Sequence, residues 1–283
     1  MVLEPFFLIT GTITVLGAYV GGVPGSMLVA GSVIINMRFI FWPAVFNYFT
    51  VGSVEQETFK YYQNVKLHRT YEHPVIQAFA GPKVDWIASH VALEGKSVLD
   101  VGGGNGYFSQ FFMKVCSDTH VVDISDTQLQ MNPLASEKRH LGSAYKLDFP
   151  DNSFDVVFAS NLLHHLDRPE VAMKEFARVA RDRVVIMEAS NANPLMWLGA
   201  CVAAHEFRSR LHSKSFVGKL ITDQKLHILE HTYQGGMLLP NRSATWTLPF
   251  AMYKTLNPYL SYFQIFIASK RPVQLFRKSR KIL

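Results

Sequence analysis

The stretch Ser97-Val-Leu-Asp-Val-Gly-Gly-Gly-Asn-Gly106 decides the fold: an apolar run contains an acid, ends in a glycine-rich turn, and precedes a helix-compatible segment over 107–115. Strand, glycine turn and helix in this order are typical of an α/β sheet that binds a ligand at the carboxyl ends of its strands. The spacing excludes a dinucleotide site, because the G-x-G-x-x-G pattern would need its third glycine at Tyr107 or Ser109. Asp100 would repel a pyrophosphate but suits a ligand that carries ammonium and sulfonium charge.

Outward from this stretch, other short apolar runs predict strands at 119–123, 154–160 and 183–188, with a helix over 169–180 before the last. Strands that alternate with helices predict a parallel sheet with right-handed crossovers. Two further runs, 226–232 and 262–269, have no clear helix between them, so we expect an antiparallel pair at the sheet edge. The chain then divides into a hydrophobic segment (1–49), a helical cap (50–96), an α/β domain (97–270) and a basic tail (271–283).

The composition fits this division. The 283 residues are 48% apolar and 18% charged, which excludes a disordered chain and allows a full core. Two cysteines cannot form a disulfide framework and favour a reducing compartment. Bases and acids nearly balance over 38–269, whereas 270–283 carries bases and no acid. This distribution disfavours nucleic acid as a partner and suits a short basic arm on phosphates or anionic lipid.

The N-terminal segment predicts membrane association. Residues 5–37 are 33 consecutive uncharged residues, more than the roughly 20 that cross a bilayer. Gly21-Gly-Val-Pro-Gly25 interrupts them, which leaves a single tilted span or a shallow hairpin of 6–20 and 27–46 open. A buried arm in a soluble oligomer is the remaining alternative. Bases that follow the run, from Arg38 to Arg69, predict by the positive-inside rule that the body faces the cytoplasm or an organelle interior, such as the mitochondrial matrix.

Four segments between residues 60 and 190 carry a family resemblance. They are Val98-Leu-Asp-Val-Gly-Gly-Gly-Asn-Gly-Tyr-Phe-Ser109, Asp123, the segment 142–155, and Ala159-Ser-Asn-Leu-Leu-His-His-Leu-Asp-Arg-Pro169. In order and spacing they resemble the class I S-adenosylmethionine-dependent methyltransferases, especially the subfamily of ubiquinone and menaquinone biosynthesis enzymes. The resemblance implies a Rossmann-like methyltransferase sheet, mostly parallel with an antiparallel edge strand, and S-adenosylmethionine as the cofactor.

The resemblance also assigns cofactor-binding residues: Asp100, Gly102, Gly104, Gly106, Asp123, Ile124, Ser143, Ala144 and Asn161. It implies that Asp123 accepts both ribose hydroxyls and that Ala144 offers its backbone N–H to the adenine ring. Ser143 departs from the family pattern, which has an acid there, although a hydroxyl can still accept a hydrogen bond. Structural alternatives stay open: Asp100 could cap the following turn, Asp123 could be an ordinary strand-end acid, and Asn161 could cap a helix.

Two adjacent histidines, His164 and His165, would point about 100° apart on a helix and cannot share one role. By resemblance, His165 faces the substrate and acts as general base on a hydroxyl; a surface or core histidine is the alternative. His205, Glu206 and His212 are of metal-ligand type, but the H-E-x-x-H pattern is absent and no metal is expected.

The sequence thus predicts methyl transfer to a small lipophilic acceptor, a quinone precursor or lipid, at a membrane surface. Membrane attachment through 1–49 would hold the pocket near such an acceptor. One alternative is a catalytically silent methyltransferase fold that serves as a subunit or assembly factor of a membrane protein complex. A base-modifying nucleic-acid enzyme is disfavoured, because Ser160-Asn-Leu-Leu replaces an N-P-P-Y-like motif.

Overall fold

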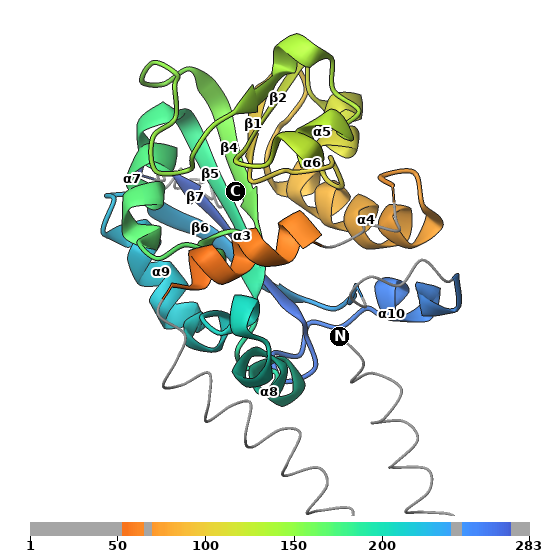
Figure 1. Ribbon diagram of the computed structural model, residues 1–283. Coiled ribbons are helices and arrows are strands. Elements are labelled where there is room, and N and C mark those ends of the chain that lie inside the picture. The colour runs from red at the N-terminus through yellow and green to blue at the C-terminus, as the bar shows by residue number, and fades with distance from the viewer. Residues whose placement is uncertain (1–52, 65–69, 239–244, 273–283) are drawn as a thin grey trace, which may run out of the picture.

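The computed structural model describes residues 53–64, 70–238 and 245–272 (Figure 1). Its centre is a seven-stranded sheet in the order β3-β2-β1-β4-β5-β7-β6. The strands are β1 (Ser97–Val101), β2 (Asp118–Asp123), β3 (Arg139–Leu141), β4 (Phe154–Ser160), β5 (Ala180–Ala189), β6 (His227–Gln234) and β7 (Phe263–Ser269). β1 to β5 pair in parallel, and β7 runs antiparallel to both β5 and β6. The predicted α/β sheet with an antiparallel edge is confirmed; the three-residue β3 was not predicted.

Helices cover both faces of the sheet, as Figure 1 shows. α7 (Pro169–Val179) and α9 (Lys214–Thr222) pack on one face, where Met173, Phe176 and Val217 are fully buried. α4 (Pro74–His90) and α5 (Ser109–Val115) pack on the other, where Phe79 and Phe112 contribute to the core. The remaining helices are α3 (Val54–Asn64), α6 (Asp126–Gln130), α8 (Pro194–Val202) and α10 (Leu248–Met252). Short 3₁₀ turns are η1 (Ser136–Lys138), η2 (Leu163–His165), η3 (Ala204–Glu206), η4 (Ser209–Leu211) and η5 (Thr245–Thr247).

Strand register brings several connections to one edge of the sheet. Ala189 at the end of β5 pairs with Phe263 at the start of β7, and Gln234 at the end of β6 pairs with the same residue. The segment 190–203, which is the first part of the connection from β5 to β6, and the connection 235–262 from β6 to β7 therefore leave the sheet at the edge where the parallel strands end. The glycine turn after β1 and the loop after β4 lie at this carboxyl edge as well.

The hydrophobic segment 1–49 and the tail beyond residue 272 lie outside the described residues. Among the residues that are described, no helix is both long and apolar enough to cross a membrane. The helix expected from residue 107 begins at Ser109. Asn161 does not cap a helix: it has a positive φ of 50°, and η2 begins two residues later with Leu162 as its N-cap.

Candidate active site

The glycine turn after β1 forms the floor of a cavity of about 800 Å³. Gly102 has φ +72°, which side chains rarely adopt, and a Cβ there would lie 2.9 Å from the Leu162 side chain. A Cβ on Gly103 would lie 2.6 Å from Asp100 Oδ2. The backbone is therefore packed so closely here that glycine is required, and a ligand can lie directly against the main chain.

Asp100 lies beneath this floor with 1% of its surface exposed. Ser109 Oγ donates a hydrogen bond of 2.7 Å to Asp100 Oδ2. Burial raises the pKa of Asp100 to about 7, and the Ser109 hydrogen bond opposes the rise only in part. A positively charged ligand at this site would stabilise the ionised carboxylate and restore its negative charge.

Asp123 ends β2 beside the glycine turn. Its Oδ2 accepts from the backbone N–H of Gly104 at 2.9 Å, and its Oδ1 accepts from Ser125 N–H at 2.8 Å. Each carboxylate oxygen has a second lone pair, so both can still accept from a ligand hydroxyl. Burial raises the pKa of Asp123, while these backbone hydrogen bonds lower it. The neighbouring Ile124 is 57% exposed and lines the same cavity.

The segment after β3 brings Ser143 and Ala144 to the cavity wall. Ser143 Oγ accepts from Tyr145 N–H at 3.2 Å, so the hydroxyl is part of a local turn. Tyr145 donates its hydroxyl to Glu55 on α3 at 2.8 Å. Ser143, which stands where the family has an acid, therefore lies in a wall that is hydrogen-bonded through Tyr145 to α3.

The loop after β4 presents Asn161 to the same cavity. Its backbone N–H donates to Met187 O at 2.8 Å, which fixes the loop against the end of β5. The side-chain oxygen Oδ1 is buried and has no hydrogen-bond partner among the residues that the structure describes. A buried acceptor of this kind is costly unless a ligand donates to it. The cavity therefore fits a cationic, hydrogen-bond-donating ligand such as S-adenosylmethionine.

His165 also reaches the cavity, as expected, and is 7% exposed. Its Nδ1 lies 3.0 Å from the carbonyl oxygen of His205 and 3.1 Å from Thr58 Oγ1. A carbonyl only accepts, so Nδ1 carries the hydrogen and Nε2 is the unprotonated nitrogen. Burial, with the charge of His164 adding to it, lowers the pKa of His165 to about 3. The ring is neutral at physiological pH and a weak proton acceptor.

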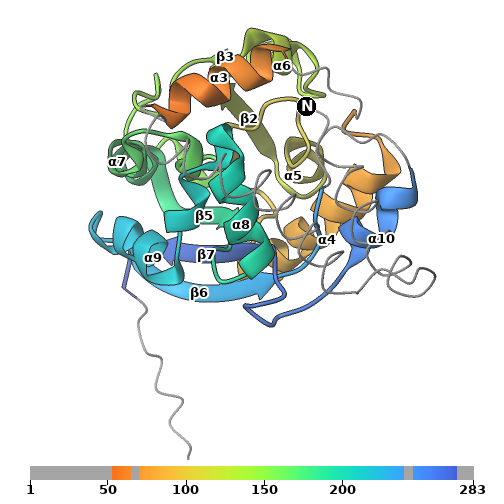
Figure 2. The same ribbon diagram turned by 60° about the horizontal axis from the view of Figure 1, so that its bottom comes forward.

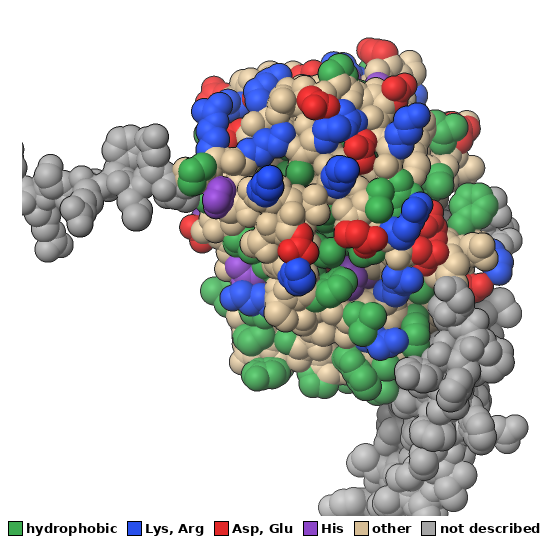
Figure 3. Space-filling view, turned by 90° about the vertical axis from the view of Figure 1, so that its left-hand side faces the viewer, with side chains coloured by type: hydrophobic (Ala, Val, Ile, Leu, Met, Phe, Trp, Pro, Cys, Tyr) green, Lys and Arg blue, Asp and Glu red, His purple; other side chains and the backbone are tan. Residues whose placement is uncertain are grey.

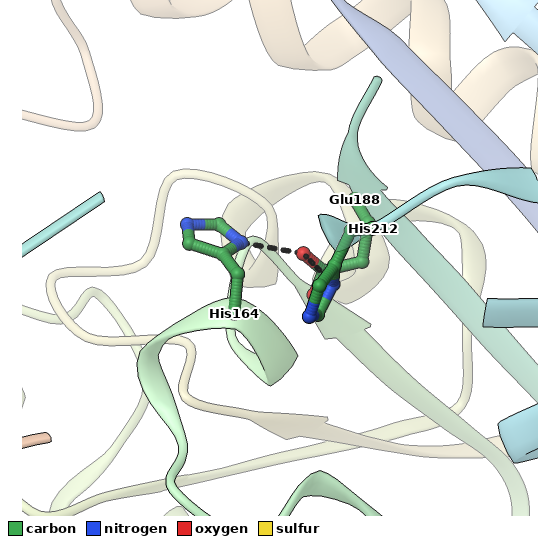
Figure 4. Close-up of side chains that lie close together, drawn as sticks. All are labelled: His164, Glu188 and His212. Carbon is green, nitrogen blue, oxygen red and sulfur yellow. Dashed lines mark hydrogen bonds and ion pairs between the residues drawn. The ribbon is translucent and has the colours of Figure 1, made fainter. Parts of the chain in front are cut away.

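His164 is not among the residues that line the cavity and lies in a buried cluster with Glu188 and His212 (Figure 4). Its Nδ1 lies 2.5 Å from Glu188 Oε2, and its Nε2 lies 3.2 Å from Glu206 Oε2. Burial alone would lower the pKa of His164, but the two carboxylate charges outweigh burial and raise the pKa to about 10. His164 is therefore a buried imidazolium between two carboxylates. His164 and His165 therefore have different surroundings, one in the ion-pair cluster and the other at the cavity.

Glu188, at the end of β5, connects this cluster to the cavity. Its Oε1 accepts the backbone N–H groups of Leu162 and Leu163 at 3.1 and 2.7 Å. Its Oε2 faces His164, and His212 Nδ1 lies 3.5 Å away (Figure 4). The charge of His164 holds the pKa of Glu188 well below its usual range despite burial. Through these bonds Glu188 fixes the loop that lines the cavity.

Metal-ligand types do converge in this cluster. Ligand atoms of His164, Glu188 and His212 lie within 4.8 Å of one another, and so do those of His164, His165 and Glu206. Both nitrogens of His164 face carboxylate oxygens and carry protons, so an ion would first have to displace a proton from a site with a high pKa. The arrangement is that of an ion-pair cluster.

Sequence reasoning did not identify α3 as part of the site. Ser53 Oγ and the Val54 N–H both bond to the carboxylate of Asp167, 2.5 and 3.2 Å away. Together with the Glu55–Tyr145 and Thr58–His165 contacts, these bonds fasten α3 over the cavity. The residues of this segment that line the cavity are Ser53, Glu55, Gln56, Thr58, Phe59 and Lys60. Asp167 lies 114 positions after Ser53 and 113 positions after Val54, so no local sequence pattern reveals that they pair.

Comparison with known proteins identifies the family of this chain. Residues 99–187 match the family model of the methyltransferase domain. A phosphatidylethanolamine N-methyltransferase of Cereibacter sphaeroides is 30% identical over 184 residues, which cover 58% of this chain and 89% of that protein. A ubiquinone/menaquinone biosynthesis C-methyltransferase of Roseobacter denitrificans is 30% identical over 146 residues, 47% of this chain and 54% of its own length. The chain thus spans about half of the quinone enzyme.

Solved structures support the fold. A putative methyltransferase from Bacillus halodurans superposes with a TM-score of 0.50 at 16% identity, covering 68% of this chain and all of that one. A methyltransferase from Thermotoga maritima gives 0.52 at 16% identity, covering 77% and 98%. This chain belongs to the class I S-adenosylmethionine-dependent methyltransferases. It is an enzyme that uses S-adenosylmethionine to methylate a small molecule.

Proposed function

We propose that this methyltransferase acts on a small lipophilic acceptor, a quinone precursor or a lipid, at a membrane surface. Residues 1–49 would attach it, with the catalytic domain on the cytoplasmic or organelle-interior side. This proposal joins the apolar run that precedes the domain to the character of the cavity. It also agrees with relatives whose names specify a phospholipid or a quinone as the product or substrate.

The observation that carries the proposal is the apolar wall of the cavity. Beyond the glycine floor the cavity is lined by side chains from separate elements: Phe59, Phe79, Phe108, Leu162, Leu166 and Leu238. Such a wall binds an apolar acceptor by removing its surface from water, and it excludes water from the transfer step.

The residues of the floor and rim would hold the cofactor. S-adenosylmethionine, when bound, supplies a methyl group already activated by a sulfonium. Asp100 would provide negative charge beneath it, Asn161 Oδ1 would accept from its donor groups, and Asp123 would accept from the ribose. Because the methyl group needs no further activation, the chain's main contribution is to align the acceptor and exclude water.

His165 would orient the acceptor. The sequence analysis assigned it as a general base, but a group with a pKa of about 3 takes up a proton poorly at neutral pH. Its neutral ring can instead accept a hydrogen bond at Nε2 while His205 O holds Nδ1. We therefore assign His165 a positioning role. If the nucleophilic atom of the acceptor carries a proton, we expect this proton to pass to solvent, during or after the methyl transfer.

A labelling experiment tests the proposal. The purified full-length chain is incubated with methyl-labelled S-adenosylmethionine and a total lipid extract in detergent micelles, and the organic phase is analysed by mass spectrometry. We expect a lipid heavier by one labelled methylene, and much less of it with Asp123→Ala when the cofactor is below saturation. Label confined to water-soluble compounds, or no label although calorimetry shows cofactor binding, would overturn the proposal.

A further inference from the structure

Large apolar side chains are exposed unevenly over the described part of the chain. Eighteen of them are exposed, and ten lie on the connections 190–203 and 235–262. These ten are Leu195, Trp197, Leu198, Trp246, Phe250, Met252, Tyr253, Leu256, Tyr259 and Leu260, and we call them the apolar edge. Soluble monomers rarely expose so many apolar side chains together without a partner.

Strand register brings the chain segments that carry these ten residues to one edge of the sheet. Both connections leave the sheet at its carboxyl edge, where Ala189, Gln234 and Phe263 meet. Figure 1 places α8 at the bottom of the molecule and α10 at its lower right, and Figure 2, in which the bottom comes forward, shows α8 near the centre of this side and α10 at its right. Figure 3 faces the left-hand side of Figure 1, away from α10. Hydrophobic side chains gather along the bottom of this view, whereas charged side chains dominate its upper part.

α8 illustrates how unusual this surface is. Of its nine residues, Ala200 and Cys201 are buried, while Leu195 is 70% and Trp197 47% exposed. Asn193 caps the helix through hydrogen bonds to Leu195 N–H and Met196 N–H, so the helix is well formed without burying an apolar face. A helix that is apolar on its solvent side is typical of a surface that meets another apolar phase.

Along the chain, the segments that carry the apolar edge have positive charge or none. Residues 189–204 contain no charged side chain, and no Asp or Glu occurs from residue 231 to residue 283. Lys254 lies among the exposed aromatic residues of 245–262. Tryptophan and tyrosine beside lysine, without acids, is the composition that favours the interface of an anionic bilayer.

We propose that the apolar edge docks on an anionic lipid bilayer and places the mouth of the active site against it. The inference rests on the proposed function, because it names the surface from which a lipophilic acceptor would enter. Two features link the edge to the cavity. Leu238, on the connection 235–262, lines the cavity, and so does Ser53, where the chain arrives from the uncharged run 5–37.

The docking surface can be tested with the tryptophans that it contains. The chain has four tryptophans, and the full-length variant Trp42→Phe/Trp86→Phe keeps Trp197 and Trp246 as reporters. It is mixed with phosphatidylcholine vesicles that contain a minor fraction of phosphatidylglycerol, with or without bromine on the acyl chains. We expect a blue shift of the emission and quenching by the brominated chains.

Charge substitutions on the same background identify the surface. Leu195→Glu with Leu256→Glu replaces two side chains that are 70% and 72% exposed, so the core is not affected. We expect the lipid concentration for half-maximal quenching to rise about tenfold or more. Met113→Glu, at a 45% exposed position on α5, is the control and should leave quenching unchanged.

Other outcomes overturn the proposal. Emission that is already blue-shifted without vesicles and insensitive to bromine would mean that residues 1–52 cover the edge. The same result with a concentration-dependent dimer in sedimentation would mean that a second copy covers it. Quenching needs no turnover, so quenching without lipid methylation would refute the acceptor assignment alone. Methylation of lipid in micelles without quenching would refute the docking surface alone.

Discussion

Glu188→Gln should destabilise the protein in a pH-dependent way. Glu188 is 0% exposed and is one of two carboxylates that keep His164 protonated. The glutamine can still accept from Leu162 and Leu163 N–H, but its amide N–H₂ would face the Nδ1–H of His164. Two donors cannot pair, so His164 must give up a proton or lose this partner.

The size of the effect follows from the pKa of His164. A histidine whose pKa rises from 6.5 to about 10 on folding contributes about 4 kcal/mol at pH 7. Glu206 retains part of this stabilisation, and removing one partner of a buried ion pair costs about 3–5 kcal/mol in other proteins. We therefore expect a loss of about 2–4 kcal/mol, or a melting temperature lower by about 10 °C.

The sign of the pH dependence distinguishes this explanation from a simple packing defect. Because the folded pKa lies above the unfolded one, the stabilisation is full below about pH 6.5 and is lost as the pH rises toward 10. Thermal denaturation followed by circular dichroism from pH 6 to 10 should show parent and variant converging. A constant difference across this range would refute the reasoning. Asp223→Asn, which removes an exposed ion pair with Lys219, is the control and should stay within about 0.5 kcal/mol.

Three predictions concern the cofactor and acceptor. Asp100, with a pKa near 7, should ionise when the cationic cofactor binds, so below pH 7 the affinity for the cofactor should increase up to about tenfold for each unit by which the pH is raised. Calorimetry would detect the released proton. Asp100→Asn should abolish this pH dependence. Asp123→Ala should weaken cofactor binding about 10- to 100-fold with unchanged circular dichroism, and unchanged affinity in calorimetry would remove the ribose assignment. His165→Ala should lower turnover at saturating cofactor. The pH–rate profile of the parent should show no ionisation near pH 6.5, because the pKa of His165 is about 3. An ionisation near pH 6.5 that the variant loses would mean that His165 is a general base after all.

The sequence predicted the strands that are continuous apolar runs. β1 and β4 have the expected bounds, because buried parallel strands are apolar on both faces and turns flank them. β3 was missed because its three residues, one of them exposed, have no such pattern. β5 is longer than predicted, since it begins at Ala180 and includes the polar Arg181 and Asp182.

The site was predictable where it depends on local sequence and not where it depends on pairing. The glycine turn, Asp123 and His165 follow from short motifs, and all of them line the cavity except Gly106, which packs against Pro133 instead. The His164–Glu188 pair requires β4 and β5 to be neighbours, and the Asp167 contacts require α3 to lie beside η2. These contacts depend on topology, which no single motif encodes.

The direction of β7 links the fold to the proposed membrane surface. A parallel strand in its place would receive its connection at the amino edge of the sheet, far from the glycine turn. Because β7 runs antiparallel to β5, the connection from β6 returns at the carboxyl edge, and Leu238 reaches the cavity from it. Apolar side chains of this connection can therefore lie at the carboxyl edge while the core on both sheet faces stays intact. One reversed strand thus accounts for the place of Leu238 in the cavity wall and for the place of the proposed docking surface.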